Sequence, residues 1–452
     1  MTNRSKLVLI VSILAISLLS IVPALGQAPV DIPVWIAFTD ATRLGWTQQK
    51  AAEYNEMFPQ YNVTVTGYSN YEELFAATAL AAEQGSLPAV VQYFEVATQD
   101  ARDSGYFRSI EQALAGRTEI NGLPVNFDDF IEPAAAYYTL DGEFTSMPWN
   151  TSSAIFFSNM NYLNAAGFDT PPATWNEVAQ VCEAVMALDN APEFCFTWPN
   201  HGWFFEQWLA QQNALYANND NGRSARATEV LFDSDAGVAI LTWLKEMYDA
   251  GYLYYSGAQG GGSWATVDQA FGSQQVAMAA YSSSDTALYT ETGRENGFEV
   301  VASFLPYNDE TGWTGNLIGG ASLWLVDGLP EDVETGALGF LLYINTTENA
   351  AEWHQITGYV AIRDSAVEML TEQGWFEENP NFRVASDQLA QSTVTIATSG
   401  ALLGSFPAIR NVVTQAIDTV LLTPNADPAE VLAAAAAQAN TILTEYNLLN
   451  VE

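Results

Sequence analysis

Strand-like and helix-like segments alternate at the start of this chain, and no other feature constrains the fold as much. Apolar or alternating residues predict three strands there: Ile32–Phe38, Asn62–Gly67 and Pro88–Phe94. The two segments between these strands have the apolar spacing and the end signals of helices. Strand–helix–strand units of this kind predict a doubly wound α/β sheet, in which ligands bind beyond the carboxyl ends of the strands. Glu95 follows the third strand directly, so we expect it to point into that crevice.

The first 26 residues have the features of a secretory signal peptide. Arg4 and Lys6 precede an apolar run, Leu7–Val22, and the segment ends at Ala24 to Gly26 with small outer residues. The alternative is an uncleaved anchor, because the run approaches the minimum length for a membrane span. We favour cleavage, and therefore a secreted, periplasmic or cell-surface protein.

The remaining chain of roughly 425 residues is too long for a single core, so we expect two lobes. Helical spacing recurs later, at Trp175–Leu188, Trp203–Tyr216, Ala236–Ala250 and Val431–Tyr446. No long linker separates the lobes, which favours several short crossovers near residues 140, 300 and 350. The predicted division is residues 27–140 plus 300–350 for an N-terminal lobe, and 141–299 plus 351–452 for a C-terminal lobe.

The charge balance excludes one class of partner. The chain has 53 acidic and 14 basic residues, a net charge of −39. Nucleic-acid binding requires a basic surface, so we expect no nucleic-acid partner. The acidic residues are scattered, which indicates a solvated surface rather than an acidic tail.

The two cysteines, Cys182 and Cys195, lie close in the sequence. In an exported chain this spacing favours a disulfide over a pair of buried thiols. The two histidines lie far apart, which makes a histidine zinc site improbable, and we expect no metal and no cofactor. Acidic residues are too frequent for any pair to indicate a glycosidase, although an extracellular carbohydrate-active enzyme remains an alternative.

Four motifs in the last third of the chain carry a family resemblance. They are IGGASLW (318–324), AEWHQITGY (351–359), EQGWFEENP (372–380) and GSFPAIR (404–410). In this order they resemble the extracellular solute-binding proteins of bacterial ABC importers, and among these the branch that binds glycerol 3-phosphate. The resemblance implies a two-lobed periplasmic-binding-protein fold, a doubly wound sheet in each lobe, a permease partner, a monomer and no catalysis.

The resemblance also implies a set of ligand-binding residues. Arg410 would hold a ligand phosphate, although its apolar surroundings alone favour an internal carboxylate as its partner. Glu95 would accept hydrogen bonds from glycerol hydroxyls, and the N–H of Gly320 would face the phosphate. The full set is Tyr71, Glu95, Ser152, Trp203, Ser282, Gly320, Tyr359 and Arg410.

Two departures from the family pattern affect the expected ligand. Asn200 stands where the family has a second tryptophan, and Asp285 would enter the site instead of Ser282 if the turn were shifted. A carboxylate there would repel phosphate and favour a neutral ligand. The sequence therefore predicts a binder of glycerol 3-phosphate or a glycerophosphodiester, with a mono- or oligosaccharide as the alternative ligand.

Overall fold

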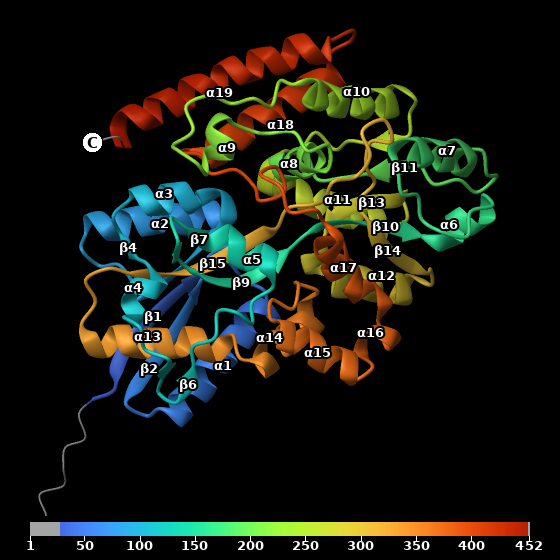
Figure 1. Cartoon of the computed structure of the whole chain (residues 1–452). Helices are drawn as coiled ribbons and strands as arrows, with labels where there is room; N and C mark the ends of the chain where they lie inside the picture. Colours follow the sequence, from blue (N-terminus) through green and yellow to red (C-terminus); the bar gives the residue numbers. More distant parts are fainter. Residues whose placement is uncertain (1–27, 451–452) are drawn as a thin grey trace, which may run out of the picture.

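The computed structural model describes residues 28–450, so the predicted signal peptide lies outside the described residues. Two main sheets organise the chain, and helices cover them (Figure 1). The first sheet contains β1 (Val30–Ile36), β2 (Tyr61–Gly67), β3 (Val90–Phe94), β4 (Phe107–Arg108), β9 (Met147–Ser152) and β15 (Gly319–Val326). The second contains β10 (Ala154–Asn159), β11 (Phe194–Thr197), β12 (Leu253–Tyr254), β13 (Val276–Ser282) and β14 (Val300–Phe304).

The first sheet has the order β2-β1-β3-β15-β4, and β9 pairs with β15. Strands β1, β2 and β3 are parallel, and β15 runs antiparallel to β3. Helices α1 (Arg43–Met57) and α2 (Tyr71–Glu83) connect the parallel strands. The predicted strand–helix–strand alternation is therefore confirmed.

The second sheet has the order β12-β11-β13-β10-β14. Strand β11 is parallel to β12 and β13, whereas β10 is antiparallel to β13 and β14. We call each sheet with the helices around it a lobe. The chain passes from the first sheet to the second between β9 and β10, and returns between β14 and β15. The lobe boundaries drawn from the sequence stay a prediction.

Helices complete both lobes. The first lobe also has α3 (Thr98–Asp103), α4 (Ile110–Leu114), α5 (Glu132–Tyr138) and α13 (Glu331–Ile344). The second has α6 (Met160–Ala165), α7 (Trp175–Met186), α8 (Gly202–Gln211), α9 (Asn218–Gly222), α10 (Asp235–Asp249), α11 (Trp264–Gly272), α12 (Thr286–Asn296), α17 (Val384–Gln391), α18 (Phe406–Leu422) and α19 (Pro428–Asn450). After α13 come α14 (Thr347–Thr357), α15 (Asp364–Glu372) and α16 (Trp375–Glu378). Two short antiparallel hairpins pair β5 (Glu119–Ile120) with β6 (Leu123–Pro124) and β7 (Thr139–Leu140) with β8 (Glu143–Phe144).

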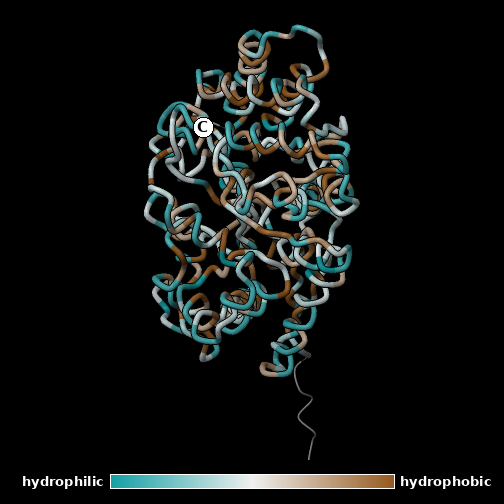
Figure 2. Tube along the Cα trace, turned by 90° about the vertical axis from the view of Figure 1, so that its right-hand side faces the viewer, coloured by the Kyte–Doolittle hydropathy of each residue, from teal (hydrophilic) through white to brown (hydrophobic). Residues whose placement is uncertain are grey.

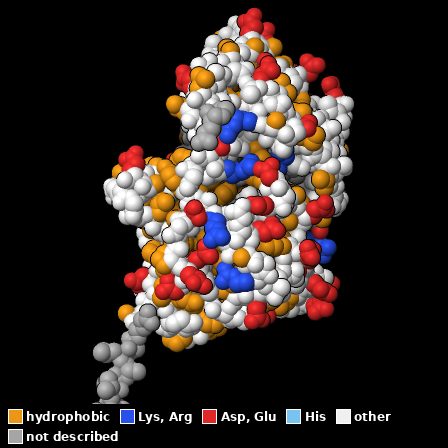
Figure 3. Space-filling view, turned by 60° about the vertical axis from the view of Figure 1, so that its left-hand side comes forward, with side chains coloured by type: hydrophobic (Ala, Val, Ile, Leu, Met, Phe, Trp, Pro, Cys, Tyr) orange, Lys and Arg blue, Asp and Glu red, His pale blue; other side chains and the backbone are white. Residues whose placement is uncertain are grey.

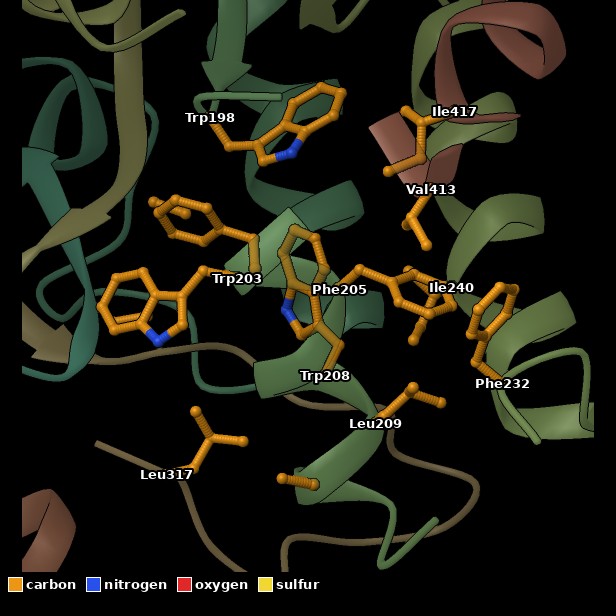
Figure 4. Close-up of a cluster of buried hydrophobic side chains, with 14 of the residues drawn as sticks. Trp198, Trp203, Phe205, Trp208, Leu209, Phe232, Ile240, Leu317, Val413 and Ile417 are labelled. Carbon is orange, nitrogen blue, oxygen red and sulfur yellow. The ribbon is translucent and has the colours of Figure 1, made fainter. Parts of the chain in front are cut away.

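The largest apolar cluster surrounds α8. Trp203 and Trp208 of this helix belong to it together with Ile240 of α10 and Val413 of α18 (Figure 4). The chain trace has apolar segments in its interior and hydrophilic segments at its edges (Figure 2). Burial of this apolar area supplies most of the driving force for folding.

The predicted disulfide is confirmed. Cys182 in α7 is bonded to Cys195 in β11, with an S–S distance of 2.10 Å. The bond links a helix to the strand that follows it.

The surface is acidic, as the composition requires. Carboxylates are scattered over the face that Figure 3 shows, with few basic side chains among them. Within residues 28–450, no helix is long and apolar enough to cross a membrane.

Candidate functional site

A cleft of about 460 Å³ lies between the two lobes. This volume is within the range of ligand pockets, roughly 300–1,000 Å³. The segments that follow β1, β3 and β13 all contribute side chains to its wall. The cleft thus lies at strand ends, where α/β sheets bind their ligands.

The structure brings all eight residues that the sequence predicts together in this cleft. They are Tyr71, Glu95, Ser152, Trp203, Ser282, Gly320, Tyr359 and Arg410. Their binding role stays a prediction, but they come from segments far apart in the chain and line one cavity.

A chain of hydrogen bonds positions Tyr71, the first residue of α2. The side-chain amide of Gln92 donates to Asn150 Oδ1 at 2.8 Å, and Asn150 Nδ2 donates to the Tyr71 hydroxyl at 2.9 Å. The Tyr71 ring stacks on Phe94, with 5.0 Å between centroids. Burial raises the pKa of Tyr71 well above its usual range, so its hydroxyl stays protonated and can donate to a ligand.

Tyr359 is held by a histidine and a tryptophan. Its ring stacks on Trp353 at 5.6 Å, and its backbone oxygen is 2.7 Å from Nδ1 of His354. His354, in α14, therefore has a structural role. Burial also raises the pKa of Tyr359, although Arg43 opposes the shift.

Gly320 occupies a position that only glycine fits. Its φ is +98°, and a Cβ there would lie 1.8 Å from the carbonyl oxygen of Asn150. The close approach of β9 thus requires glycine, and it leaves this part of the cleft wall without a side chain.

Two serines line the cleft at strand ends. Ser152 is the last residue of β9, and Ser282 is the last residue of β13. The hydroxyl of Ser282 accepts from the backbone N–H of Ser284 at 3.2 Å, which fixes the following turn. Asp285, in the same turn, also lines the cleft. The sequence posed Ser282 and Asp285 as alternatives, and the structure places both in the wall.

Arg410 is buried in α18 and already has two carboxylate partners. Its Nε is 2.6 Å from Glu206 Oε1, and its Nη2 is 2.8 Å from Glu206 Oε2 and 2.7 Å from Glu95 Oε1. Burial lowers the pKa of Arg410, but Glu206 and Glu95 outweigh burial and raise it. Burial raises the pKa of Glu206, and Arg410 opposes that shift. Arg410 therefore has the internal carboxylate partners that its apolar surroundings favour, and its role in binding a phosphate stays a prediction.

Carboxylates outnumber cations in the cleft wall. The carboxylates are Asp40, Glu72, Glu95, Asp268 and Asp285, and the cations are Arg43 and Arg410. His201 adds no charge, because burial and then Arg410 lower its pKa to about 3. The wall therefore has a surplus of negative charge.

Sequence reasoning missed several residues of this wall. Asp40 and Arg43 follow β1, so the strand-end rule that identified Glu95 would have found them. Trp264 opens α11 after a glycine-rich segment and gave no such signal. Glu206 is buried in α8 behind the wall, and only the structure shows that it pairs with Arg410.

Comparison with known proteins identifies the class. The model of the family described as "Bacterial extracellular solute-binding protein" matches residues 49–384, well over half of the chain. The chain belongs to this family.

This solute-binding protein is similar to characterised relatives along most of its length. It is 29% identical over 405 residues to the sn-glycerol-3-phosphate-binding periplasmic protein UgpB of Salmonella typhimurium, covering 88% of this chain and 89% of the relative. It is 28% identical over 429 residues to UgpB of Escherichia coli O1:K1, covering 93% and 94%.

Solved structures share the fold. UgpB from Mycobacterium tuberculosis, in complex with glycerophosphocholine, superposes with a TM-score of 0.75 at 20% identity, over 93% of this chain and 99% of that one. The GacH receptor of Streptomyces glaucescens, solved with acarbose, gives 0.74 at 18% identity over 93% and 100%. The predicted two-lobed fold is confirmed.

The protein is therefore the solute-binding component of an ABC importer. Its relatives bind solutes and are not enzymes. The alternative of an extracellular carbohydrate-active enzyme is wrong.

Proposed function

We propose that this solute-binding protein captures a glycerophosphodiester in the interlobe cleft and delivers it, as a monomer, to a membrane permease. One observation carries the proposal: the eight residues carried over from the glycerol-3-phosphate binders line a single cavity. Two tyrosines, two serines and Arg410 line this cavity together with Gly320, which leaves part of the wall without a side chain. Donors of these types suit the oxygen atoms of a phosphate and of glycerol.

The charges of the wall favour a diester over free glycerol 3-phosphate. A phosphate monoester carries about −1.5 to −2 at neutral pH, whereas a diester carries a single charge. Glu95 and Glu206 already compensate Arg410. Asp40 and Asp285 likewise pair with Arg43, so each additional negative charge on the ligand would compete with carboxylates for the two cations of the wall.

A sugar is the second candidate, and the aromatic side chains of the wall favour it. Phe38, Trp203, Trp264 and Tyr281 line the cleft together with the carboxylates. Rings with a few placed polar groups are typical of small-molecule sites, and carboxylates accept hydrogen bonds from sugar hydroxyls. A solved neighbour with this fold was crystallised with acarbose.

Calorimetry with three ligands separates the candidates. We expect glycerophosphocholine to bind, glycerol 3-phosphate to bind at least about tenfold more weakly, and maltotriose not to bind. Binding of maltotriose alone would replace the diester with a sugar as the ligand.

Arg410→Ala tests the predicted contribution of Arg410 to the site, where Arg410 also holds Glu95 in the cleft wall. Truncating one member of a buried charged pair should weaken diester binding by roughly 2–5 kcal/mol. Arg383→Ala is the control, because Arg383 makes an exposed pair with Asp387 and does not line the cleft. Circular dichroism and thermal unfolding check that both variants fold, and equal affinities would remove Arg410 from the site.

A further inference from the structure

Arg43 and Asp285 form an ion pair between the lobes. Arg43 is the first residue of α1 in the first lobe, and Asp285 lies in the turn after β13 in the second. Arg43 Nη2 is 3.1 Å from Asp285 Oδ1, and both residues line the cleft. Their side chains are 27% and 16% exposed, so a ligand in the cleft can reach both charges.

Each member of the pair keeps a partner on its own lobe. Arg43 Nε is 3.2 Å from Asp40 Oδ2, and its guanidinium lies 5.3 Å from the centre of the Phe38 ring. Asp285 Oδ2 accepts from the Ser284 hydroxyl at 2.6 Å. A ligand can therefore enter between Arg43 and Asp285 without removing all the partners of either.

The surroundings of Asp285 suit a cation, whereas Arg43 suits an anion. On the second lobe, Asp268 of α11 lies near Asp285, and its Oδ1 is buried with no hydrogen-bond partner among residues 28–450. Trp264 packs against Tyr281 beside these carboxylates, with 4.9 Å between ring centroids. Carboxylates next to aromatic rings attract an organic cation. On the first lobe, the Arg43 guanidinium offers donors to an anion.

Arg43 is also more available than Arg410. Arg410 is 6% exposed and bonded to two carboxylates that are themselves buried. Displacing either carboxylate would leave it buried without its cation, which is costly. The partners of Arg43 are more exposed, so exchanging one of them costs less.

We propose that the Arg43–Asp285 pair selects glycerophosphodiesters that carry a cationic head group, an inference that rests on the proposed function. The ligand phosphate replaces Asp285 as a partner of Arg43, and the ligand ammonium replaces Arg43 as a partner of Asp285. Every charge then keeps an opposite charge beside it. The phosphate of a diester without a cation would pair with Arg43, and Asp285 would then face that phosphate without a cationic partner.

Calorimetry on the whole protein tests this with two diesters that differ in charge. Glycerophosphocholine is zwitterionic, and glycerophosphoglycerol is anionic. The wild type should prefer glycerophosphocholine by about tenfold, equivalent to about 1.4 kcal/mol. In Asp285→Asn the preference should disappear, because glycerophosphocholine loses the carboxylate partner of its ammonium and glycerophosphoglycerol loses a repulsive neighbour. Arg43→Gln should weaken both diesters.

The control is Asp387→Asn, which removes the same charge from an exposed pair outside the cleft and should keep the wild-type preference. Asp285→Ser is a second variant in case the asparagine variant does not fold. An Asp285 variant that changes both affinities by the same factor, or a wild type without preference, would overturn the inference and leave the proposed function standing. A wild type that binds neither diester would overturn both.

Discussion

At Gly202, the first residue of α8, a Cβ would lie 2.7 Å from Cγ and 2.9 Å from Cβ of Arg410. These atoms are close to the Arg410 backbone and cannot move away freely. The small residue therefore lets α18 approach α8 closely enough for Arg410 to meet Glu206. A glycine that precedes a tryptophan in the sequence gives no indication of this contact.

Gly202→Ala should displace Arg410 and destabilise the protein by roughly 1–3 kcal/mol, the usual cost of overpacking. Urea unfolding measures the loss, and calorimetry should show weaker ligand binding. Gly261→Ala is the matched control, because Gly261 also lines the cleft but a Cβ there would meet nothing within 4 Å. Equal midpoints for the two variants would contradict this role of Gly202.

Among the elements, the disulfide between α7 and β11 closes a loop with a sequence separation of 13. Closing a loop of this length restricts the unfolded chain and should stabilise the fold by about 3 kcal/mol. The double variant Cys182→Ser, Cys195→Ser should unfold at correspondingly lower urea concentration. The wild type measured with a reductant should match the variant. An unchanged midpoint would show that the bond adds no stability.

The regular elements of the first lobe were predictable from the sequence. Alternating apolar residues identified β2, and helical spacing with end signals identified α2, because local pattern and final burial agree there. The antiparallel pairing of β15 with β3 was not predictable, because the residues of an apolar strand do not indicate whether it runs parallel or antiparallel to its neighbour.

Those residues of the candidate site that belong to a family motif were predictable from the sequence. Arg410 and Tyr359 belong to quoted motifs, whereas Arg43 and Glu206 belong to none. Their importance arises from contacts between residues more than 200 positions apart, such as Arg43 with Asp285. Spacing along the chain does not encode such contacts.

At the scale of the whole molecule, the lobes also meet on a side where Asp100 of α3 accepts from the backbone N–H of Ser405 at 3.1 Å. Asp100 Oδ2 is buried and has no hydrogen-bond partner in the part of the chain that the structure describes. Burial raises the pKa of Asp100 to about 7, the hydrogen bond from Ser405 opposes the shift, and Asp103 adds to it. Between about pH 4 and pH 7 the folded protein therefore holds a proton that the unfolded chain releases.

This difference in protonation means that stability falls as pH rises through that window. Asp100→Asn cannot ionise, so it should gain on the order of 2–4 kcal/mol over the wild type at pH 7.5 and much less at pH 4. Thermal unfolding at both pH values measures the gain, and the exposed Asp189→Asn should show none. A gain that is the same at both pH values would contradict the role of ionisation.

The net charge of −39 should also affect ligand capture. An anionic ligand meets long-range repulsion, so moderate salt should speed its association by screening the distant carboxylates. Stopped-flow fluorescence with glycerophosphoglycerol should show this increase, whereas a neutral ligand should show almost none. An association rate that falls with salt would indicate that nearby cations dominate the approach.

Because the disulfide uses both cysteines of the chain, any added cysteine would be its single reactive thiol. Glu72 is exposed at the edge of the cleft, on the helix that also carries Tyr71. A polarity-sensitive dye attached through Glu72→Cys would sit where the lobes approach each other around a ligand. The natural covalent link inside one lobe thus makes the protein a ready scaffold for an optical sensor of the solute it captures.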